Sequence, residues 1–169
     1  MTRETEPPRW LDETQQQAWA GIRALMFRAF PEMERTFAAH DLSAAQYQIF
    51  AVLSDAPGET LGLSELAASA NLSKSRLTHR LRILVESGEV EIIDDSDDRR
   101  AKNATLTEKG RKRLDYLAPL HVEDVQRLIF DSLTPKQTEA LADAMSAIAD
   151  HVNQYPEFLN PRPSSLPPG

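Results

Sequence analysis

Two short helical segments joined by a tight turn constrain this chain more than any other feature of its sequence. Residues 64–70 predict a short helix capped by Ser64, and residues 71–72 predict the turn. Ser73 is a favoured N-cap for a second helix, which ends at Gly88. The apolar residues of the second helix follow helical spacing: Leu77, Leu81, Leu84 and Val85. This pattern indicates a helix-turn-helix arrangement with one buried and one solvent-facing side.

The solvent-facing side of the second helix is basic, although the whole chain carries a net charge of −7. Between residues 71 and 85 there is no acid, and the five basic or imidazole side chains are Lys74, Arg76, His79, Arg80 and Arg82. Ser75, Arg76, His79 and Arg82 should face outward, with Ser73 and Lys74 in the first turn. A local basic surface of this kind favours DNA binding, because side chains on a helix can reach base edges in the major groove. The alternative interpretation is an ordinary solvated helix face.

A β-hairpin is predicted directly after this helix. Residues 90–93 are short and β-branched, residues 103–106 can pair with them, and a charged loop joins the two strands. Arg100 in the loop could enter the minor groove, with Asp98 orienting it through a bidentate ion pair. Two alternatives remain: a solvated loop, or a weak cation site formed by Asp94, Asp95, Asp97 and Asp98. The loop lacks the glycine and the distal glutamate of a calcium-binding loop, which disfavours the cation site.

The segments on either side are predicted to be helical. Residues 11–39 carry an apolar stripe, with a kink or break near Phe30 because Pro31 follows it. Ser43 should cap a helix through Leu53, and Thr107 should cap a helix through about Phe130 that bends at Pro119. The last helix should run from the Thr134-Pro-Lys-Gln137 signal to about Asn153. The stripe of the first helix is Ile22, Met26, Ala29, Met33 and Phe37, and the expected buried stripe of the last helix is Leu141, Met145, Ile148 and Val152.

Composition excludes several classes of protein. The chain has no cysteine, which rules out disulfides, thiolate metal sites and thiol chemistry. Its six glycines form no phosphate-binding loop, and its four histidines lack metal-ligand spacing, so we expect no enzyme activity, no cofactor and no metal. We find neither a secretory signal nor a membrane span of about 18 apolar residues, and therefore expect a soluble, cytoplasmic, nucleoid-associated protein. The proline-rich segment 154–169 should be disordered.

Several stretches together resemble the MarR (multiple antibiotic resistance regulator) family of bacterial winged helix-turn-helix regulators. The stretches are Leu72-Ser-Lys-Ser-Arg-Leu-Thr-His-Arg-Leu, Glu86-Ser-Gly-Glu-Val90, Asp98-Arg-Arg-Ala-Lys102, Leu106-Thr-Glu-Lys-Gly110 and Leu42-Ser-Ala-Ala-Gln46. The resemblance covers about residues 10–153 and departs from the family at Glu89 and Ile92, where an apolar and a basic residue are usual. It implies a mainly α fold with a small β-hairpin wing.

The resemblance also implies an organisation and a function. Residues 1–9 would be a tail, 43–107 the winged helix-turn-helix, and 10–42 with 108–153 the dimerisation helices. A homodimer would bind double-stranded DNA at a palindromic operator as a ligand-responsive repressor. The DNA-binding residues would be Ser73, Lys74, Ser75, Arg76, Thr78, His79, Arg82, Asp98, Arg99, Arg100 and Lys102.

The same resemblance implies a small aromatic or phenolic effector bound between the dimer helices and the DNA-binding part. Candidate lining residues are Trp19, His40, Tyr47, Tyr116 and His121, although aromatic residues at helical spacing are more often core. The competing functional interpretation is a winged-helix protein-interaction module without sequence-specific DNA binding. The acidic wing and the net charge of −7 motivate that alternative.

Overall fold

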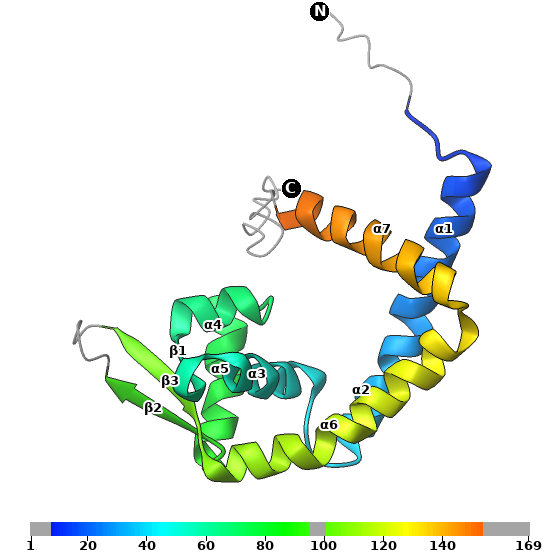
Figure 1. Cartoon of the computed structure of the whole chain (residues 1–169). Helices are drawn as coiled ribbons and strands as arrows, with labels where there is room; N and C mark the ends of the chain where they lie inside the picture. The colour runs from blue at the N-terminus through cyan, green and yellow to red at the C-terminus, as the bar shows by residue number, and fades with distance from the viewer. Residues whose placement is uncertain (1–7, 95–100, 154–169) are drawn as a thin grey trace, which may run out of the picture.

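The computed structural model describes residues 8–94 and 101–153, in which a lobe of short helices and a small sheet adjoins a long helical arm (Figure 1). The arm begins with α1 (Glu13–Ala24), a π-helical turn η1 (Leu25–Ala29) and α2 (Phe30–Ala38), and it ends with α6 (Glu108–Leu128), η3 (Phe130–Ser132) and α7 (Pro135–Asn153). The lobe contains α3 (Ala44–Asp55), η2 (Pro57–Glu59), β1 (Thr60–Gly62), α4 (Leu63–Ser69), α5 (Lys74–Glu86), β2 (Val90–Asp94) and β3 (Lys102–Leu106). The predicted fold class, mainly α with a small β wing, is therefore confirmed.

Side-chain caps set most helix starts at the predicted residues. Ser43 caps α3 in a reciprocal capping box with Gln46, and Ser73 and Thr107 cap α5 and α6. The predicted cap at Ser64 is wrong, because α4 begins at Leu63 with Gly62 as its N-cap. The strand β1 runs directly into this helix, so Ser64 lies inside the first helical turn and is not at the N-cap position.

The predicted hairpin is confirmed, but it belongs to a three-stranded sheet. Antiparallel pairing of β2 with β3 runs from Val90↔Leu106 to Asp94↔Lys102. The other edge of β3 pairs with β1, from Thr60↔Thr105 to Gly62↔Asn103, which gives the strand order β1-β3-β2. The sequence missed β1 because three residues are too few to display a period-2 pattern.

The core of the lobe lies between α3, α4, α5 and the sheet, and the first half of α6 closes it. Its largest fully buried side chains are Ile49, Phe50, Leu53, Leu66, Leu84, Val90 and Leu117. Leu77 and Leu81 of α5 join this core, whereas Val85 remains 39% exposed. The apolar side of α5 is thereby anchored, and its opposite side faces solvent.

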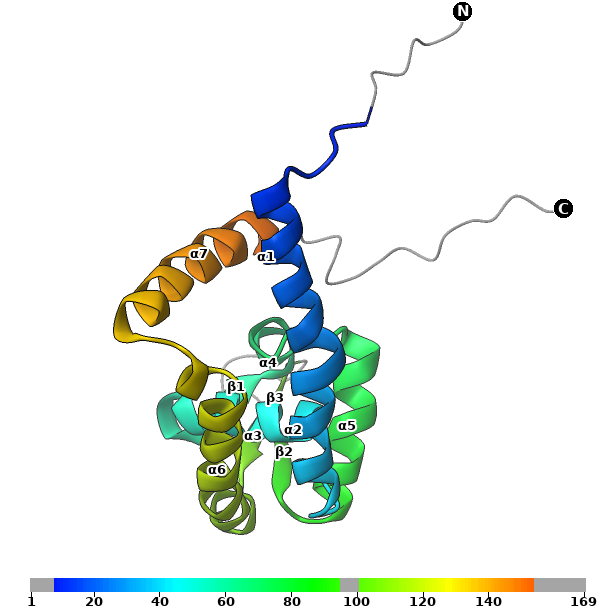
Figure 2. The same cartoon turned by 90° about the vertical axis from the view of Figure 1, so that its right-hand side faces the viewer.

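The first three helical elements form one rod, which Figure 2 shows descending beside the lobe. The π-helical turn immediately precedes Pro31, and the Phe30 amide there donates to the carbonyl of Leu25, five residues back. Pro31 itself has no amide hydrogen to donate and its ring crowds the preceding turn, so a wider turn accommodates the ring without breaking the helix. The predicted kink or break at Phe30 is thus realised as a change of helix type.

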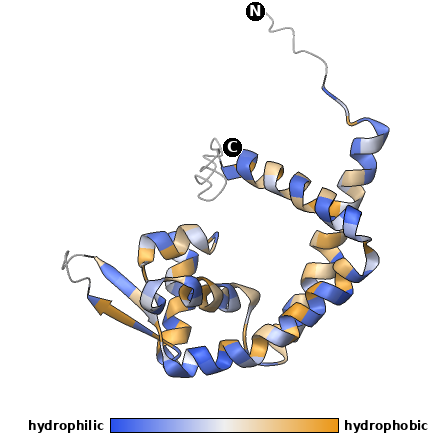
Figure 3. Ribbon diagram, in the orientation of Figure 1, coloured by the Kyte–Doolittle hydropathy of each residue, from blue (hydrophilic) through white to orange (hydrophobic). Residues whose placement is uncertain are grey.

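Most of the large exposed apolar side chains lie on the arm. Figure 3 shows apolar residues alternating with polar ones along the arm helices. The predicted buried stripe of α7 is wrong for the single chain: Met145, Ile148 and Val152 are 38%, 46% and 44% exposed. Met26 in the first helical rod is 46% exposed, while Met33 and Phe37 further along are buried against the lobe and α6. Helical spacing predicted the apolar faces correctly but could not show that this chain leaves them uncovered.

Candidate nucleic-acid interface

The outward side of α5 carries the polar and basic side chains that the sequence predicts. Lys74, Ser75, Arg76, Thr78 and His79 are exposed, and the Ser73 hydroxyl accepts from the Arg76 amide at 3.4 Å to start the helix. Neither Lys74 nor Arg76 forms an ion pair within the described residues. Their charges are therefore available to an anionic partner.

The two flanks of α5 differ in chemistry. Toward α3, a hollow of about 390 Å³ is lined by Ala45, Leu72, Ser75, Arg76, His79 and Arg80. Toward β2, an apolar groove of about 280 Å³ is lined by Leu63, Thr78, Leu81, Arg82, Val85, Glu86 and Ile92. The site prediction omitted Arg80, which is half-buried at the polar flank, although the run of basic residues on this helix was a signal for it.

Two of the predicted DNA-contacting residues already form a hydrogen bond or an ion pair within α5. The Thr78 hydroxyl donates to the Lys74 carbonyl at 2.8 Å, so it completes the hydrogen bonding of its own helix. Arg82 lies 3.9 Å from Glu86 in an exposed pair one turn apart. These two residues differ from Lys74 and Arg76, because a DNA phosphate would have to compete with an existing partner.

The wing is described only near its base. Lys102 pairs with Asp94 across the last register position of β2 and β3. Asp98, Arg99 and Arg100 lie outside the described residues, as do Asp95 and Asp97 of the alternative cation site. Asp94 is the one member of that alternative site that the structure describes, and a lysine neutralises it.

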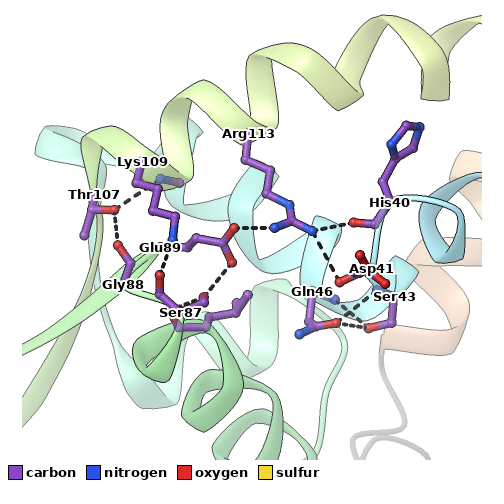
Figure 4. Close-up of polar contacts among 12 residues, drawn as sticks. His40, Asp41, Ser43, Gln46, Ser87, Gly88, Glu89, Thr107, Lys109 and Arg113 are labelled. Carbon is purple, nitrogen blue, oxygen red and sulfur yellow. Dashed lines mark hydrogen bonds and ion pairs between the residues drawn. The ribbon is translucent and has the colours of Figure 1, made fainter.

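The turn that follows α5 packs tightly against the start of α6 (Figure 4). The Thr107 hydroxyl donates to the Gly88 carbonyl at 2.8 Å, and Lys109 Nζ donates to the Ser87 carbonyl at 2.6 Å. Gly88 has a φ of 73°, the left-handed conformation expected of a glycine at a helix C-terminus. The end of α5 and the start of the wing are consequently fixed to the arm.

Glu89 is the residue at this turn whose environment the sequence did not predict. It is 2% exposed, and Arg113 Nη1 of α6 donates to its Oε1 at 2.7 Å. A buried carboxylate requires such a charged partner. Its position where the family usually has an apolar residue was a signal, but the identity of the partner was not visible in the sequence.

Four of the five candidate effector-pocket residues form two pairwise ring contacts. His40 and Tyr116 are in edge-to-face contact with ring centroids 5.3 Å apart, and Tyr47 lies 4.9 Å from His121. Phe37 stacks on Tyr47 at 4.6 Å and lies 5.4 Å from His121, so Phe37, Tyr47 and His121 form one aromatic cluster. Trp19 does not join this aromatic cluster; it lies on α1 and is 46% exposed.

The aromatic cluster contains one unpaired polar atom. His121 Nδ1 is buried and has no hydrogen-bond partner among the described residues. Burial lowers the pKa of His121, and the nearby Asp124 carboxylate partly opposes that effect. Burial likewise raises the pKa of Tyr47. The imidazole is thus held in an environment that favours its neutral form.

Two negative findings apply to residues 8–94 and 101–153. None of their helices is long and apolar enough to cross a membrane. They also contain no group of three or more histidine, aspartate or glutamate side chains placed to hold a metal ion.

Comparison with known proteins identifies the family. A family model described as MarR family matches residues 40–101. AbsC, a MarR family transcriptional regulator from Streptomyces coelicolor, has a crystal structure that superimposes on this chain with a TM-score of 0.82. The two sequences are 31% identical, and the match covers 87% of this chain and 99% of AbsC. The chain belongs to the MarR family. The resemblance inferred from the sequence is therefore confirmed.

Two further relatives indicate what proteins of this family do. Sco3205, a MarR family transcriptional regulator from Streptomyces coelicolor, was solved in complex with DNA; it is 28% identical, with a TM-score of 0.81, and the match covers 96% of this chain and 97% of Sco3205. The HTH-type transcriptional repressor YetL of Bacillus subtilis is 31% identical over 97 residues, which cover 57% of this chain and 58% of YetL. These MarR-family relatives are transcriptional regulators rather than enzymes.

Proposed function

We propose that this MarR-family chain is a homodimeric repressor that binds a palindromic DNA operator. The observation that carries the proposal is the exposed basic side of α5, which has no acid before Glu86 and whose Lys74 and Arg76 have no ion-pair partner among the described residues. Residues 43–107 would form the DNA-binding lobe, and residues 10–42 and 108–153 the dimerisation region. The DNA complex of Sco3205 and the repressor YetL support this assignment.

The proposed contacts divide between two grooves. The first turns of α5 would enter the major groove, where Arg76 can donate two hydrogen bonds to guanine and serine or threonine can contact bases or backbone. Arg100, held by Asp98, would enter the minor groove from the wing. The remaining members of the proposed interface would contact bases or phosphates around these two points: Ser73, Lys74, Ser75, Thr78, His79, Arg82, Arg99 and Lys102.

Dimerisation is supported by an apolar groove of about 390 Å³ on the arm. Its lining comes from α1, η1, the end of α6 and α7: Ala18, Gly21, Ile22, Leu25, Leu128, Ile129, Ser132, Leu133, Leu141, Ala144, Met145 and Ile148. An exposed apolar groove rimmed by polar residues is typical of an association surface. The arm helices of a second copy would bury this groove and, with it, the uncovered face of α7.

An effector would bind beside the aromatic cluster, where arm and lobe meet. A small aromatic or phenolic anion could stack on Tyr116 or His40, and its polar group could reach the unpaired His121 Nδ1. Trp19 is not part of this proposed pocket, because it lies on α1 away from the cluster. Binding there would change the relative placement of arm and lobe and release the DNA.

The test is fluorescence anisotropy of the purified protein with its own upstream intergenic DNA. Arg76→Ala should weaken binding by about 1–3 kcal/mol, the usual cost of losing a bidentate base contact. Arg35→Ala is the matched control, since Arg35 is an exposed arginine on α2 that pairs with Glu32. Equal affinity of wild type and Arg76→Ala, or flow-through of the wild type on heparin, would contradict the proposal and favour the interaction module.

A further inference from the structure

One buried ion pair connects the lobe to both ends of the arm that border it (Figure 4). The Glu89 side chain is 3% exposed and accepts from Arg113 Nη1 at 2.7 Å through Oε1. Its second oxygen, Oε2, accepts from the Ser87 hydroxyl at 2.7 Å. Both carboxylate oxygens are therefore engaged, one by the arm and one by the turn after α5.

The second terminal nitrogen of Arg113 reaches a different segment. Nη2 donates to the carbonyl of His40 and, at 3.3 Å, to the carbonyl of Asp41. These two residues form the turn between α2 and α3, where Asp41 has a left-handed φ of 54°. A single guanidinium thus joins α6, the turn before α3 and the turn after α5.

This ion pair fixes the relative orientation of the segments that it joins, and it adds little to the free energy of unfolding. Replacing a buried ion pair by well-packed apolar residues is often neutral or stabilising. An arginine fork, in contrast, fixes the relative positions of all the groups it bonds, and a lysine cannot reproduce that planar geometry. Glu89 and Arg113 therefore hold the orientation of three segments at once, which an apolar pair of similar volume would leave free to shift.

We propose that Glu89 and Arg113 are positioning residues that fix the angle of the DNA-binding lobe relative to α2 and α6. The proposal rests on the proposed function, because a homodimer must place two lobes at the separation of two operator half-sites. Glu89 immediately precedes β2 and accepts at 2.7 Å from Arg113 of the arm helix α6, so it links the end of α5 and the start of the wing to the arm. Neither residue would contact DNA.

The test compares two variants with a matched control. Arg113→Lys retains the charge but not the fork, and the double variant Glu89→Leu with Arg113→Met replaces the pair by apolar side chains. Glu108→Gln is the control, because Glu108 forms an exposed pair with Lys112 on the same helix. Each protein is measured by anisotropy against the operator, against operators whose centre is lengthened or shortened by about two base pairs, and against a single half-site.

A second measurement is independent of DNA. The chain has no cysteine, so Glu65→Cys on the exposed side of α4 introduces a unique spin-label site in each subunit. Electron-spin distance measurements then report the separation of the two lobes. We expect a narrow distribution in the wild type and in Glu108→Gln, and a broad one in both pair variants.

The outcomes separate this proposal from the proposed function. It predicts that both variants keep the half-site affinity within about twofold and lose at least about tenfold of the preference for the natural spacing. Unchanged spacing preference or an unchanged distance distribution in both variants would overturn the positioning role. If the wild type binds no operator while the distribution still broadens in the variants, the proposed function fails and the positioning role stands.

Discussion

Gly110 shows how closely α6 approaches the turn that follows α5. A Cβ at this position would lie 2.2 Å from the Glu89 carbonyl oxygen and 2.6 Å from Leu106 Cδ1. Backbone at this distance cannot yield as a flexible side chain would, so Gly110→Ala should lower the free energy of unfolding by about 1–3 kcal/mol. Urea unfolding measures the effect. Lys112→Ala, at an exposed position two residues along, is the control and should stay within about 0.5 kcal/mol of wild type.

Asp124 gives the chain a pH-dependent contribution to stability. Its side chain is 10% exposed and accepts from the Thr36 hydroxyl at 2.5 Å and from Arg127 at 2.7 Å. The Thr36 bond, followed by the bond and charge of Arg127, lowers the pKa of Asp124 below its ordinary 3.8, although burial partly opposes this. Since the folded-state pKa is the lower one, the stabilisation is complete above 3.8 and is lost as the pH falls through the folded-state pKa.

Thr36→Val should reveal that contribution. At neutral pH the free energy of unfolding of the variant should be lower than that of wild type by about 1.5–3 kcal/mol, the range for a hydrogen bond to a charged group. The difference should shrink as the pH falls from 3.8 through the lower folded-state pKa of Asp124, because the wild-type carboxylate then becomes protonated. Urea unfolding across this pH range tests the prediction, and a difference that stays constant down to the lowest pH would contradict it.

Among the elements, α7 depends most on something outside the single chain. None of its residues is buried, and Met145 and Ile148 line the apolar groove with α1. Met145→Glu would place a charge in that groove, so we expect the proposed dimer to dissociate into monomers, as measured by analytical ultracentrifugation. Ser146→Glu adds the same charge on the opposite side of α7, between Asp143 and Asp150, and should leave the dimer intact. Dissociation by both variants alike would argue against the groove as the interface.

Most elements could be predicted because their signals are local. The caps Ser43, Ser73 and Thr107 act within three residues, and the left-handed Asn71 marks the helix-turn-helix turn with a φ of 52°. The strand β1 could not be predicted, because pairing with β3 creates it across more than 40 residues of chain. The exposure of the α7 stripe was also hidden, since helical spacing shows which face is apolar but not what covers it.

The candidate site was predictable to a similar extent. Exposure of Lys74 and Arg76 follows from the helical period once Leu77 and Leu81 face inward. The link from Glu89 to Arg113 joins residues 24 positions apart, and the turn at His40 is 73 positions from Arg113. Such distant pairs arise from tertiary packing, so the sequence could mark Glu89 as unusual without naming its partner.

At the scale of the whole molecule, charge is distributed unevenly. The chain carries −7 overall, yet the exposed side of α5 bears Lys74 and Arg76 and no acid before Glu86. Release of counterions from the phosphates that these side chains contact should make binding fall with salt, whereas repulsion between DNA and the acidic remainder lowers the affinity itself. Lys74→Gln should reduce the slope of log affinity against log salt by about 0.9, the value for one lost phosphate contact.

The measurement is anisotropy on the operator over a salt series from about 50 to 200 mM. Lys136→Gln provides a control, because Lys136 lies on the first turn of α7 in the arm. A wild-type affinity that does not change with salt would contradict the phosphate contacts, and an equal effect of Lys136→Gln would place the salt dependence outside α5.

The meeting of both lobe boundaries at Arg113 bears on how such proteins can diversify. The chain passes from arm to lobe at His40–Ser43 and returns at Thr107, and the hydrogen bonds of Arg113 and Thr107 hold these two junctions to α6 and to the turn after α5. Residues 43–107 are thus a continuous segment whose two junctions are both held to the start of α6, while Phe37, Leu114 and Leu117 of the arm help close its core. On the proposed function, recombination at these two junctions would carry the DNA-contacting residues into another arm, provided that the new arm supplies equivalent apolar side chains for the core.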